Sequence, residues 1–523
     1  MGYRVLIPAA GTGSRLGAAT RYLSKALVAV DNRPALAHVI DSFPPDTEFV
    51  IALGYKGGLI REFLQLAYPG RKFIFCEVSP YEGPGSGLGL SVLACREHLR
   101  QPFTFISCDT LVRGEILPPD HDWLGYADLP SGAQYRGLEI SGGKVTRILE
   151  KGEPGEGKLY IGLAGIKNHG PFWTAMEAGG AAAVAQGEAY GLRLLPPGAE
   201  ARRFDWFDTG TPEALAAARE AFKSPGAPNI LEKSNEAIWF TGGEVIKFSD
   251  DKKFIANRAR RAGLLAGYVP EVTGVTEHMY RYRSAEGAIL SEAVTPALFQ
   301  GLLEHSRGFW RPAGLSAEAA AAFRRGCMDF YKAKTLKRVD EFYKNFGRAD
   351  DAAVVNGQKL PPLAELLAAV DWDGLSAGLP GRFHGDFHFE NILWDEKAKK
   401  FTFLDWRQEF GGDLETGDVY YDLAKLLHGL IVCHELIAKG RYAADWKDGE
   451  LRYALERKPV LEDCEREFMK WLPANGYDAG KVRLLTALIY LNIAALHHFP
   501  YCLLLYGLGK RMLAESVAGS VPR

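Results

Sequence analysis

The sequence has no excess of one charge, no paired cysteines and no long uninterrupted apolar run. Its 523 residues carry 62 Lys and Arg against 64 Asp and Glu, so a basic field for nucleic acid is excluded. The seven scattered cysteines show no Cys-x-x-Cys pair, which argues against a disulfide framework or a zinc ribbon. Asn492, two histidines and Pro500 interrupt the most apolar segment, 484–508, so we expect two core helices there and no membrane span. No charged leader with an apolar core precedes the first expected strand, so a cytoplasmic location is expected.

The composition is that of an ordinary globular protein, at a length that suits more than one domain. Hydrophobic residues make up 47% of the chain and charged residues 24%, as in soluble globular proteins. The clearest linker is the Pro- and Gly-containing segment 223–229. We therefore expect two large domains, 1–222 and 230–523, joined by this linker.

The first 220 residues alternate short β-branched runs with helical stretches. The expected strands are 5–8, 49–53, 73–76 and 103–107, and the expected helices are 34–43, 59–67 and 89–99. This alternation predicts an α/β domain with a parallel sheet covered by helices. A further helix is expected after Thr211, a good N-cap that is followed by Pro212.

The remainder of the chain has a different pattern. Short strands are expected in 230–290, including a hairpin at Gly242-Gly243 and a strand that ends in Lys247. From about Ser316 the chain is expected to be mostly helical. Two short strand-like runs, 391–394 and 401–404, interrupt this helical region. The pattern predicts an α+β domain.

A Gly-rich turn directly follows the first strand. It contains Ala10, Gly11 and Gly13, and such a turn exposes backbone N–H groups to a phosphate. The dinucleotide-binding fingerprint fails, because Leu16 stands at its third glycine position. Two cations follow instead, Arg15 and Lys25. This order suits a nucleoside triphosphate, whose leaving pyrophosphate must be neutralised.

Together with Asp109 and the segment 206–211 (Trp-Phe-Asp-Thr-Gly-Thr), this pattern resembles the sugar-phosphate and phosphocholine nucleotidyltransferase family over residues 1–222. The resemblance implies a Rossmann-like fold of the GT-A type. It implies that Arg15 and Lys25 hold the triphosphate and that Asp109 and Asp208 bind Mg²⁺.

The same resemblance implies which residues contact the acceptor and which contact the base of the nucleotide. The segment 83–89, with Gly85, Ser86 and Gly87, is similar to the loop that reads the base, and Glu150 and Lys151 are similar to a pair near the acceptor phosphate. In this chemistry an acceptor phosphate attacks the α-phosphorus and pyrophosphate leaves. Because a phosphate is already a competent nucleophile, positioning, Mg²⁺ and cations carry most of the catalysis.

The most specific motif lies in the C-terminal half. Asp386 and Asn391 have the five-residue spacing of a kinase catalytic loop, and Asp405 follows the second strand-like run, where kinases place a metal-binding Asp. A transferring phosphoryl group needs a base near the alcohol and oxygen ligands for Mg²⁺. The nearby His384 and His388 show no third metal ligand in the sequence, so we expect them to pack the loop.

Residues 230–510 resemble the aminoglycoside phosphotransferase and choline kinase group of bilobal, protein-kinase-like enzymes. The resemblance implies that Asp386 is the catalytic base, that Asn391 and Asp405 bind Mg²⁺ and that Lys247 contacts the ATP phosphates. Asp422, on an expected core helix, would support the loop. The segment 252–270 contains no Glu to pair with Lys247.

The two sites together predict a bifunctional enzyme. The kinase would phosphorylate a small alcohol with ATP, and the nucleotidyltransferase would activate the product with a second NTP for a surface polysaccharide or lipid. We favour a sugar or polyol and CTP as the second NTP, with UTP or GTP possible for a sugar. Alternatives are choline, if Trp394, Trp406, Tyr420, Tyr421 and Trp471 form a cation-binding cage, and a silent, regulatory kinase domain.

Overall fold

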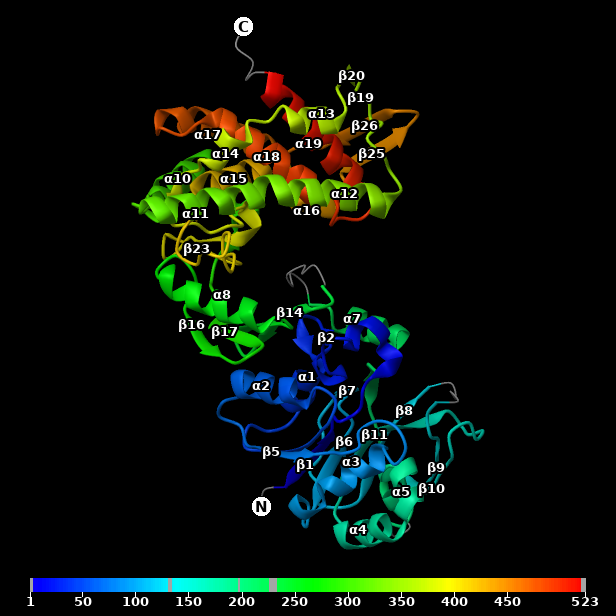
Figure 1. Ribbon diagram of the computed structural model, residues 1–523. Coiled ribbons are helices and arrows are strands. Elements are labelled where there is room, and N and C mark those ends of the chain that lie inside the picture. Colours follow the sequence, from blue (N-terminus) through cyan, green and yellow to red (C-terminus); the bar gives the residue numbers. More distant parts are fainter. Residues whose placement is uncertain (1–2, 130–133, 196–197, 225–232, 519–523) are drawn as a thin grey trace. The chain divides into compact units, whose positions relative to one another are not determined.

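The computed structural model describes residues 3–129, 134–195, 198–224 and 233–518, which belong to two compact units (Figure 1). The first unit consists of Met1–Ile255 with Thr273–Ser284, and the second of Ala256–Val272 with Ala285–Arg523. Within the described ranges, no helix is both long and apolar enough to cross a membrane. The linker expected at 223–229 lies outside the described residues from position 225 onward.

The first unit is built around a mixed sheet, one half of which is parallel. Among the described residues the strand order is β5-β4-β1-β6-β11-β8-β12-β10-β9. The parallel half consists of β5 (Phe73–Glu77), β4 (Glu48–Leu53), β1 (Arg4–Pro8) and β6 (Phe103–Ile106). The other half, mainly antiparallel, consists of β11 (Lys158–Ile166), β8 (Trp123–Asp128), β12 (Glu200–Arg203), β10 (Lys144–Ile148) and β9 (Leu138–Ser141). The expected parallel sheet is therefore confirmed for its four N-terminal strands.

Each face of the sheet has its own apolar core. In β1, Val5 and Ile7 pack into one cluster while Leu6 packs into the other. Because helices cover both faces, the parallel strands are apolar along nearly their whole length. The helices of this unit are α1 (Ala35–Asp41), α2 (Gly57–Ala67), α3 (Leu88–Ala94), α4 (His169–Ala178), α5 (Gly180–Gln186), α6 (Glu188–Leu192) and α7 (Pro212–Phe222).

The three helices expected before residue 100 lie within two residues of their expected bounds except at one end. The Thr211 hydroxyl caps α7 by accepting from the Ala214 backbone N–H at 3.3 Å, as expected. The helix expected at 89–99 is shorter: α3 ends at Ala94, and a separate 3-10 turn covers Arg96–His98. Further 3-10 turns at Ser14–Thr20 and Lys25–Leu27 follow β1, and β2 (Ala29–Val30) pairs with β3 (Arg33–Pro34).

A second sheet of the first unit packs on helix α2 (Figure 1). Its strands, in the order β14-β15-β17-β16, are β14 (Glu236–Thr241), β15 (Glu244–Ser249), β17 (Met279–Arg283) and β16 (Val272–Val275). The hairpin at Gly242-Gly243 is as expected, but β15 continues two residues beyond Lys247. Trp239 lies edge-on to Phe63 of α2, with ring centroids 5.4 Å apart, and His278 Nδ1 lies 2.8 Å from Glu62 Oε1.

The second unit is mainly helical. The two core helices expected in 484–508 are α18 and α19, and α11 continues through a π-helical turn at Asp329–Ala333 into α12. From Lys252 onward the helices are α8 (Lys252–Leu264), α9 (Leu290–Ala293), α10 (Pro296–Phe309), α11 (Ala317–Met328), α12 (Lys334–Phe346), α13 (Leu363–Ala368), α14 (Trp372–Ser376), α15 (Val419–Ile431), α16 (His434–Ala438), α17 (Pro459–Ala474), α18 (Ala479–Ala494) and α19 (Tyr501–Ala518).

The second unit has more strand than its sequence indicates. The expected runs near 391–394 and 401–404 are β22 (Ile392–Asp395) and β23 (Lys400–Phe403). A hairpin of β25 (Tyr442–Lys447) and β26 (Glu450–Leu455), which packs on α19, was not expected, although alternating apolar residues and the Asp448-Gly449 turn mark it in the sequence. Short strands complete the unit: β18 (Ala288–Ile289), β19 (Val354–Val355), β20 (Gln358–Lys359), β21 (Pro380–Gly381) and β24 (Gly417–Asp418).

Candidate active sites

A cavity of about 420 Å³ opens at the carboxyl ends of β1 and β6. In α/β sheets with parallel strands, ligands bind at this edge. The predicted residues that line the cavity are Ala10, Gly11, Arg15, Lys25, Ser86, Gly87, Asp109, Lys151 and Asp208. Three other predicted residues, Gly13, Gly85 and Glu150, are not part of its described lining.

Gly13 acts on the cavity through the position of Lys25. Its φ of 66° lies in the left-handed region, and a Cβ there would lie 2.8 Å from the Cβ of Lys25. A side chain at position 13 would therefore displace the lysine. The Ser24 hydroxyl accepts from the Ala26 backbone N–H at 3.4 Å, which caps the turn that begins with Lys25.

Lys25 and Asp109 form an ion pair in the cavity wall. Lys25 Nζ lies 2.8 Å from Asp109 Oδ2, and the two side chains are 21% and 15% exposed. Burial, the largest single effect, raises the pKa of Asp109, but the charge and hydrogen bond of Lys25, a backbone hydrogen bond and the charge of Arg15 together hold this pKa below its usual value. Burial likewise acts to lower the pKa of Lys25, but the charge and hydrogen bond of Asp109, together with the Cys108 thiol, raise this pKa above its usual value.

Strand pairing holds Asp208 beside Asp109. The strands β13 (Asp205–Asp208) and β7 (Thr110–Arg113) pair antiparallel, so Asp208 lies opposite Thr110. Asp208 Oδ2 accepts from the Tyr135 hydroxyl at 2.7 Å, and Oδ1 accepts from the Gly210 backbone N–H at 3.0 Å. Burial, and then the nearby charge of Asp109, raise the pKa of Asp208.

The charged groups converge beside Gly210. A Cβ on this glycine would lie 3.1 Å from Arg15 Nη2, 3.1 Å from Asp208 Oδ1 and 3.3 Å from Asp109 Oδ2. Two carboxylate oxygens that face one small space form a donor set suited to Mg²⁺. The residues present therefore fit the expected metal, and Arg15 brings positive charge to the same place.

Glu150 and Lys151 face different surroundings. Lys151 lines the cavity. Glu150 instead pairs with Arg193 Nη1 and Arg136 Nη1, each at 2.5 Å, and these two arginines lower the pKa of Glu150 to about 2. Because Arg136 itself lines the cavity, Glu150 acts on the cavity by holding this arginine.

Four further residues of the cavity carry no sequence motif. Tyr135, Arg136, Tyr160 and Glu188 come from segments outside the Gly-rich turn and the two Asp segments. Glu188, on α6, is only 5% exposed, and burial raises its pKa to about 7. An acidic side chain in a helix is ordinarily solvated, so the sequence offered no signal that this one is buried.

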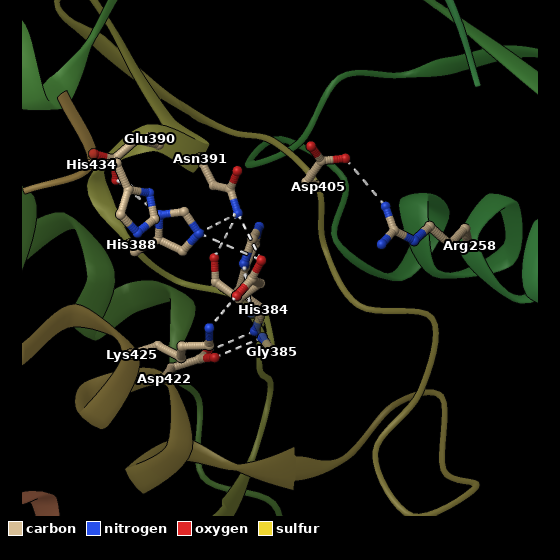
Figure 2. A network of polar contacts seen from close by, with 11 residues as sticks. Arg258, His384, Gly385, His388, Glu390, Asn391, Asp405, Asp422, Lys425 and His434 are labelled. Carbon is tan, nitrogen blue, oxygen red and sulfur yellow. Dashed lines mark hydrogen bonds and ion pairs between the residues drawn. The ribbon is translucent and has the colours of Figure 1, made fainter. Parts of the chain in front are cut away.

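In the second unit, the segment 384–391 forms a compact loop before β22 (Figure 2). The Asn391 side-chain amide donates to the backbone carbonyl of Asp386 at 2.9 Å and to its Oδ2 at 3.1 Å. The Leu404 backbone N–H donates to the Asn391 carbonyl at 2.7 Å, which brings the end of β23, and Asp405 after it, next to the loop. The structure therefore brings Asp386, Asn391 and Asp405 into one region.

Asp422, on helix α15, supports this loop from below. It is fully buried and accepts from the backbone N–H groups of His384 and Gly385, both at 2.6 Å, and from Trp310 Nε1 at 3.1 Å. Burial raises the pKa of Asp422 to about 6. Gly385 has a φ of 88°, and a Cβ there would lie 2.5 Å from the Cβ of Arg407, so the loop needs glycine at this position.

Lys425, one turn further along α15, is a functional candidate that the motif search missed. Its Nζ lies 2.7 Å from Asp386 Oδ1, and its side chain is 11% exposed. Burial acts to raise the pKa of Asp386, but Lys425 and then His388 outweigh it and hold this pKa well below its usual value. Lys425 is 39 positions after Asp386, outside any local motif.

Asp405 has a positively charged neighbour on helix α8. Asp405 has a φ of 56°, and its Oδ1 lies 3.3 Å from Arg258 Nη1 (Figure 2). Asn257, on the same helix, donates to Glu409 Oε2 at 3.2 Å. Asn391 and Asp405 offer oxygen ligands, as Mg²⁺ requires. Lys247 lies on β15 of the first unit, 7% exposed, with its Nζ 5.9 Å from the Tyr282 ring centroid.

Two segments of the chain match known families. Residues 5–118 match the MobA-like NTP transferase domain, and residues 314–454 match the phosphotransferase enzyme family. Both are families of enzymes, so the chain joins a nucleotidyltransferase domain of Rossmann-like fold to a kinase-like phosphotransferase domain. The two resemblances seen in the sequence are thereby confirmed.

Solved structures of nucleotidyltransferases are also similar to parts of the chain. UDP-glucose pyrophosphorylase from Acinetobacter baumannii is 17% identical, with a TM-score of 0.36, and the match covers 42% of this chain and 93% of that one. CTP:phosphocholine cytidylyltransferase from Streptococcus pneumoniae is 14% identical, with a TM-score of 0.36, and the match covers 43% of this chain and 100% of that one. No curated relative matches the chain.

Proposed function

We propose that the chain is a bifunctional enzyme in which a kinase module, 230–523, phosphorylates a small alcohol with ATP. A nucleotidyltransferase module, 1–222, then transfers the nucleotidyl group of a second NTP to that phosphate, and pyrophosphate leaves. The observation that carries the proposal is that one chain contains two separate sites, each with an ion pair between a lysine and an aspartate. One is Lys25 with Asp109, and the other is Lys425 with Asp386.

In the first module, Arg15 and Lys25 neutralise the triphosphate and the leaving pyrophosphate. Asp109 and Asp208 would hold Mg²⁺, which supplies charge neutralisation at the α-phosphate when bound. Ser86 and Gly87, which line the cavity, would contact the base, and Lys151, which also lines it, would orient the acceptor phosphate. No proton has to be removed from the acceptor, so the module works by positioning and charge neutralisation, without a general base.

In the second module, Asp386 accepts the proton of the substrate hydroxyl as the phosphoryl group transfers. Lys425 keeps this carboxylate ionised and fixes its direction, since its Nζ contacts Oδ1. Asn391 and Asp405 would hold Mg²⁺, which neutralises the ATP phosphates when bound, and Lys247 would contact those phosphates. Asp422 acts by positioning the loop.

We propose a sugar or polyol, in preference to choline, as the substrate class. The aromatic residues considered for a cation-binding cage are engaged in separate contacts: Trp406 is 1% exposed, Tyr421 packs against Phe330 at 4.8 Å, and Trp471 stacks on Tyr477 at 5.5 Å. A cage needs its ring faces turned to one cation. CTP is the proposed second NTP, with UTP or GTP as alternatives for a sugar phosphate.

The test separates the two activities. Asp109→Asn should abolish nucleotidyl transfer and spare phosphorylation, and Asp386→Asn should do the converse, as followed by mass spectrometry of the products. Addition of the kinase product to the Asp386→Asn variant should restore the activated product. If it does not, the two modules do not act in sequence. If Asp386→Asn leaves phosphorylation unchanged, the kinase-like module is silent.

A further inference from the structure

Two histidines and a glutamate meet beside the kinase loop, and we propose that they bind a transition-metal ion of the Zn²⁺ class. His388 and Glu390 belong to the loop, and His434 is the first residue of α16 (Figure 2). One ligand atom from each of the three residues lies within 4.8 Å of the others. This site is distinct from the Mg²⁺ positions proposed at Asn391 and Asp405.

The distances suit a metal held by nitrogen and oxygen. His388 Nδ1 lies 3.0 Å from Glu390 Oε2, and His434 Nδ1 lies 3.7 Å from the same oxygen. Zn²⁺ bonds of about 2.0–2.2 Å in tetrahedral geometry place neighbouring ligand atoms roughly 3.4 Å apart. These two separations are therefore within a few tenths of an ångström of coordination geometry, and the ligand nitrogens of the two histidines lie within 4.8 Å of each other.

A third histidine provides a second, independent observation. His428, on α15, is 2% exposed, and neither of its ring nitrogens has a hydrogen-bond partner in the described part of the chain. Its ring centroid lies 5.8 Å from that of His434 and 6.3 Å from that of His388. A buried polar group without a partner is costly, and a rotation of this ring toward the cluster would make it the fourth ligand.

A proton on His388 explains only part of the cluster. It accounts for the approach of His388 to Glu390 and to Asp386 Oδ2, at 3.0 Å and 3.5 Å. It does not account for the convergence of His434 and His428 on the same place. Two or three imidazoles with one carboxylate select Zn²⁺ and similar ions over Mg²⁺, which prefers oxygen ligands.

The position of the site gives the metal a structural role next to the base. His388 Nε2 lies 3.1 Å from Asn391 Nδ2 and 3.5 Å from Asp386 Oδ2, while its Nδ1 faces Glu390 and the metal position. A metal on Nδ1 leaves the proton on Nε2, turned toward the carboxylate. The ion would therefore fix the loop and the direction of this donor at the same time.

The test measures metal binding without any activity. Untagged full-length protein is stripped with EDTA and titrated with ZnCl₂ by calorimetry and with CoCl₂ by visible absorption. We expect one tight equivalent of Zn²⁺ and the intense cobalt band of a tetrahedral site. His434→Ala should weaken Zn²⁺ binding by about 100-fold or more, because even outer-shell changes cost roughly 10–100-fold. Glu390→Gln, with its fold checked by circular dichroism, should act in the same direction.

His498→Ala is the matched control, because this exposed histidine lies outside the cluster and near the same end of the unit. It should bind Zn²⁺ as the unaltered protein does. His428→Ala should lose the tetrahedral cobalt band if this residue is the fourth ligand. The proposal is overturned if the stripped protein binds no stoichiometric Zn²⁺, or if both His434→Ala and Glu390→Gln bind it with unchanged affinity.

Discussion

Replacement of Asp422 by alanine tests whether helix α15 holds the kinase loop. The change leaves three buried donors without their acceptor: the backbone N–H groups of His384 and Gly385, and Trp310 Nε1. An unsatisfied buried donor costs about 1–3 kcal/mol. Because the loop can relax in part, we expect a loss of about 3 kcal/mol in the unfolding free energy of the second unit. This corresponds to a midpoint lower by roughly 6–12 °C for a unit of this size.

The raised pKa of Asp422 predicts that the effect of this replacement depends on pH. Burial raises this pKa from 3.8 to about 6 in the folded protein. The stability that accompanies a raised acid pKa is fully present below pH 3.8 and is lost as the pH rises through about 6. The difference between the native protein and Asp422→Ala should therefore be larger at pH 5 than at pH 8.

Differential scanning calorimetry at the two pH values, with separate assays of phosphorylation and nucleotidyl transfer, measures these effects. Phosphorylation should fall and nucleotidyl transfer should persist, because Asp422 lies in the second unit. Asp445→Ala, which removes an exposed carboxylate on β25, is the control and should change stability by no more than about 0.5 kcal/mol. An Asp422→Ala protein that melts with the native one at both pH values would refute the reasoning.

Three further outcomes are expected. Lys425→Met should slow phosphorylation roughly 100-fold. It should also shift the acid limb of the pH–rate profile to higher pH, because the pKa of Asp386 rises without this cation. An unshifted acid limb would contradict the role assigned to Lys425. Glu188→Gln should flatten the pH dependence of the first unit's melting temperature. The raised pKa of Glu188 means that the native protein loses stability between pH 4.5 and about 7, and the variant should not. The same pH dependence in both proteins would contradict this prediction. Trp239→Ala should destabilise the first unit by about 3–5 kcal/mol and spare the second, and equal losses in both would disagree with the packing on Phe63.

Local patterns predicted the parts of the fold that local forces determine. The four N-terminal parallel strands, the Thr211 cap and the Gly242-Gly243 hairpin follow from apolar runs, a capping hydroxyl and turn-forming glycines. The β25–β26 hairpin was missed although the sequence carries its signal: Tyr442, Ala444 and Trp446 occupy alternate positions, and Asp448-Gly449 is a typical two-residue hairpin turn.

In the candidate sites, residues close together in the sequence were predicted, and residues brought together only by the tertiary fold were not. Asp386 and Asn391 were found because the loop fixes their spacing within five residues. Lys425 and His434 were missed, because the tertiary fold alone brings helices α15 and α16 to that loop. Glu150 and Lys151 are adjacent in the chain, yet only Lys151 lines the cavity, because neighbours in a strand or turn project in different directions.

Helix α2 limits which substitutions and which exchanges of the kinase module the chain can tolerate. Its Phe63 and Leu64 are fully buried, and its Glu62 and Leu66 contact His278 and Arg281 of the second sheet. Gly58, Arg61 and Gln65 of this helix are exposed, but substitutions on its buried sides must be compatible with both sheets. Residues of α2 and of β17 should therefore covary among homologues. Exchange of the kinase module for that of another protein at residue 230 should fail unless α2 is exchanged with it.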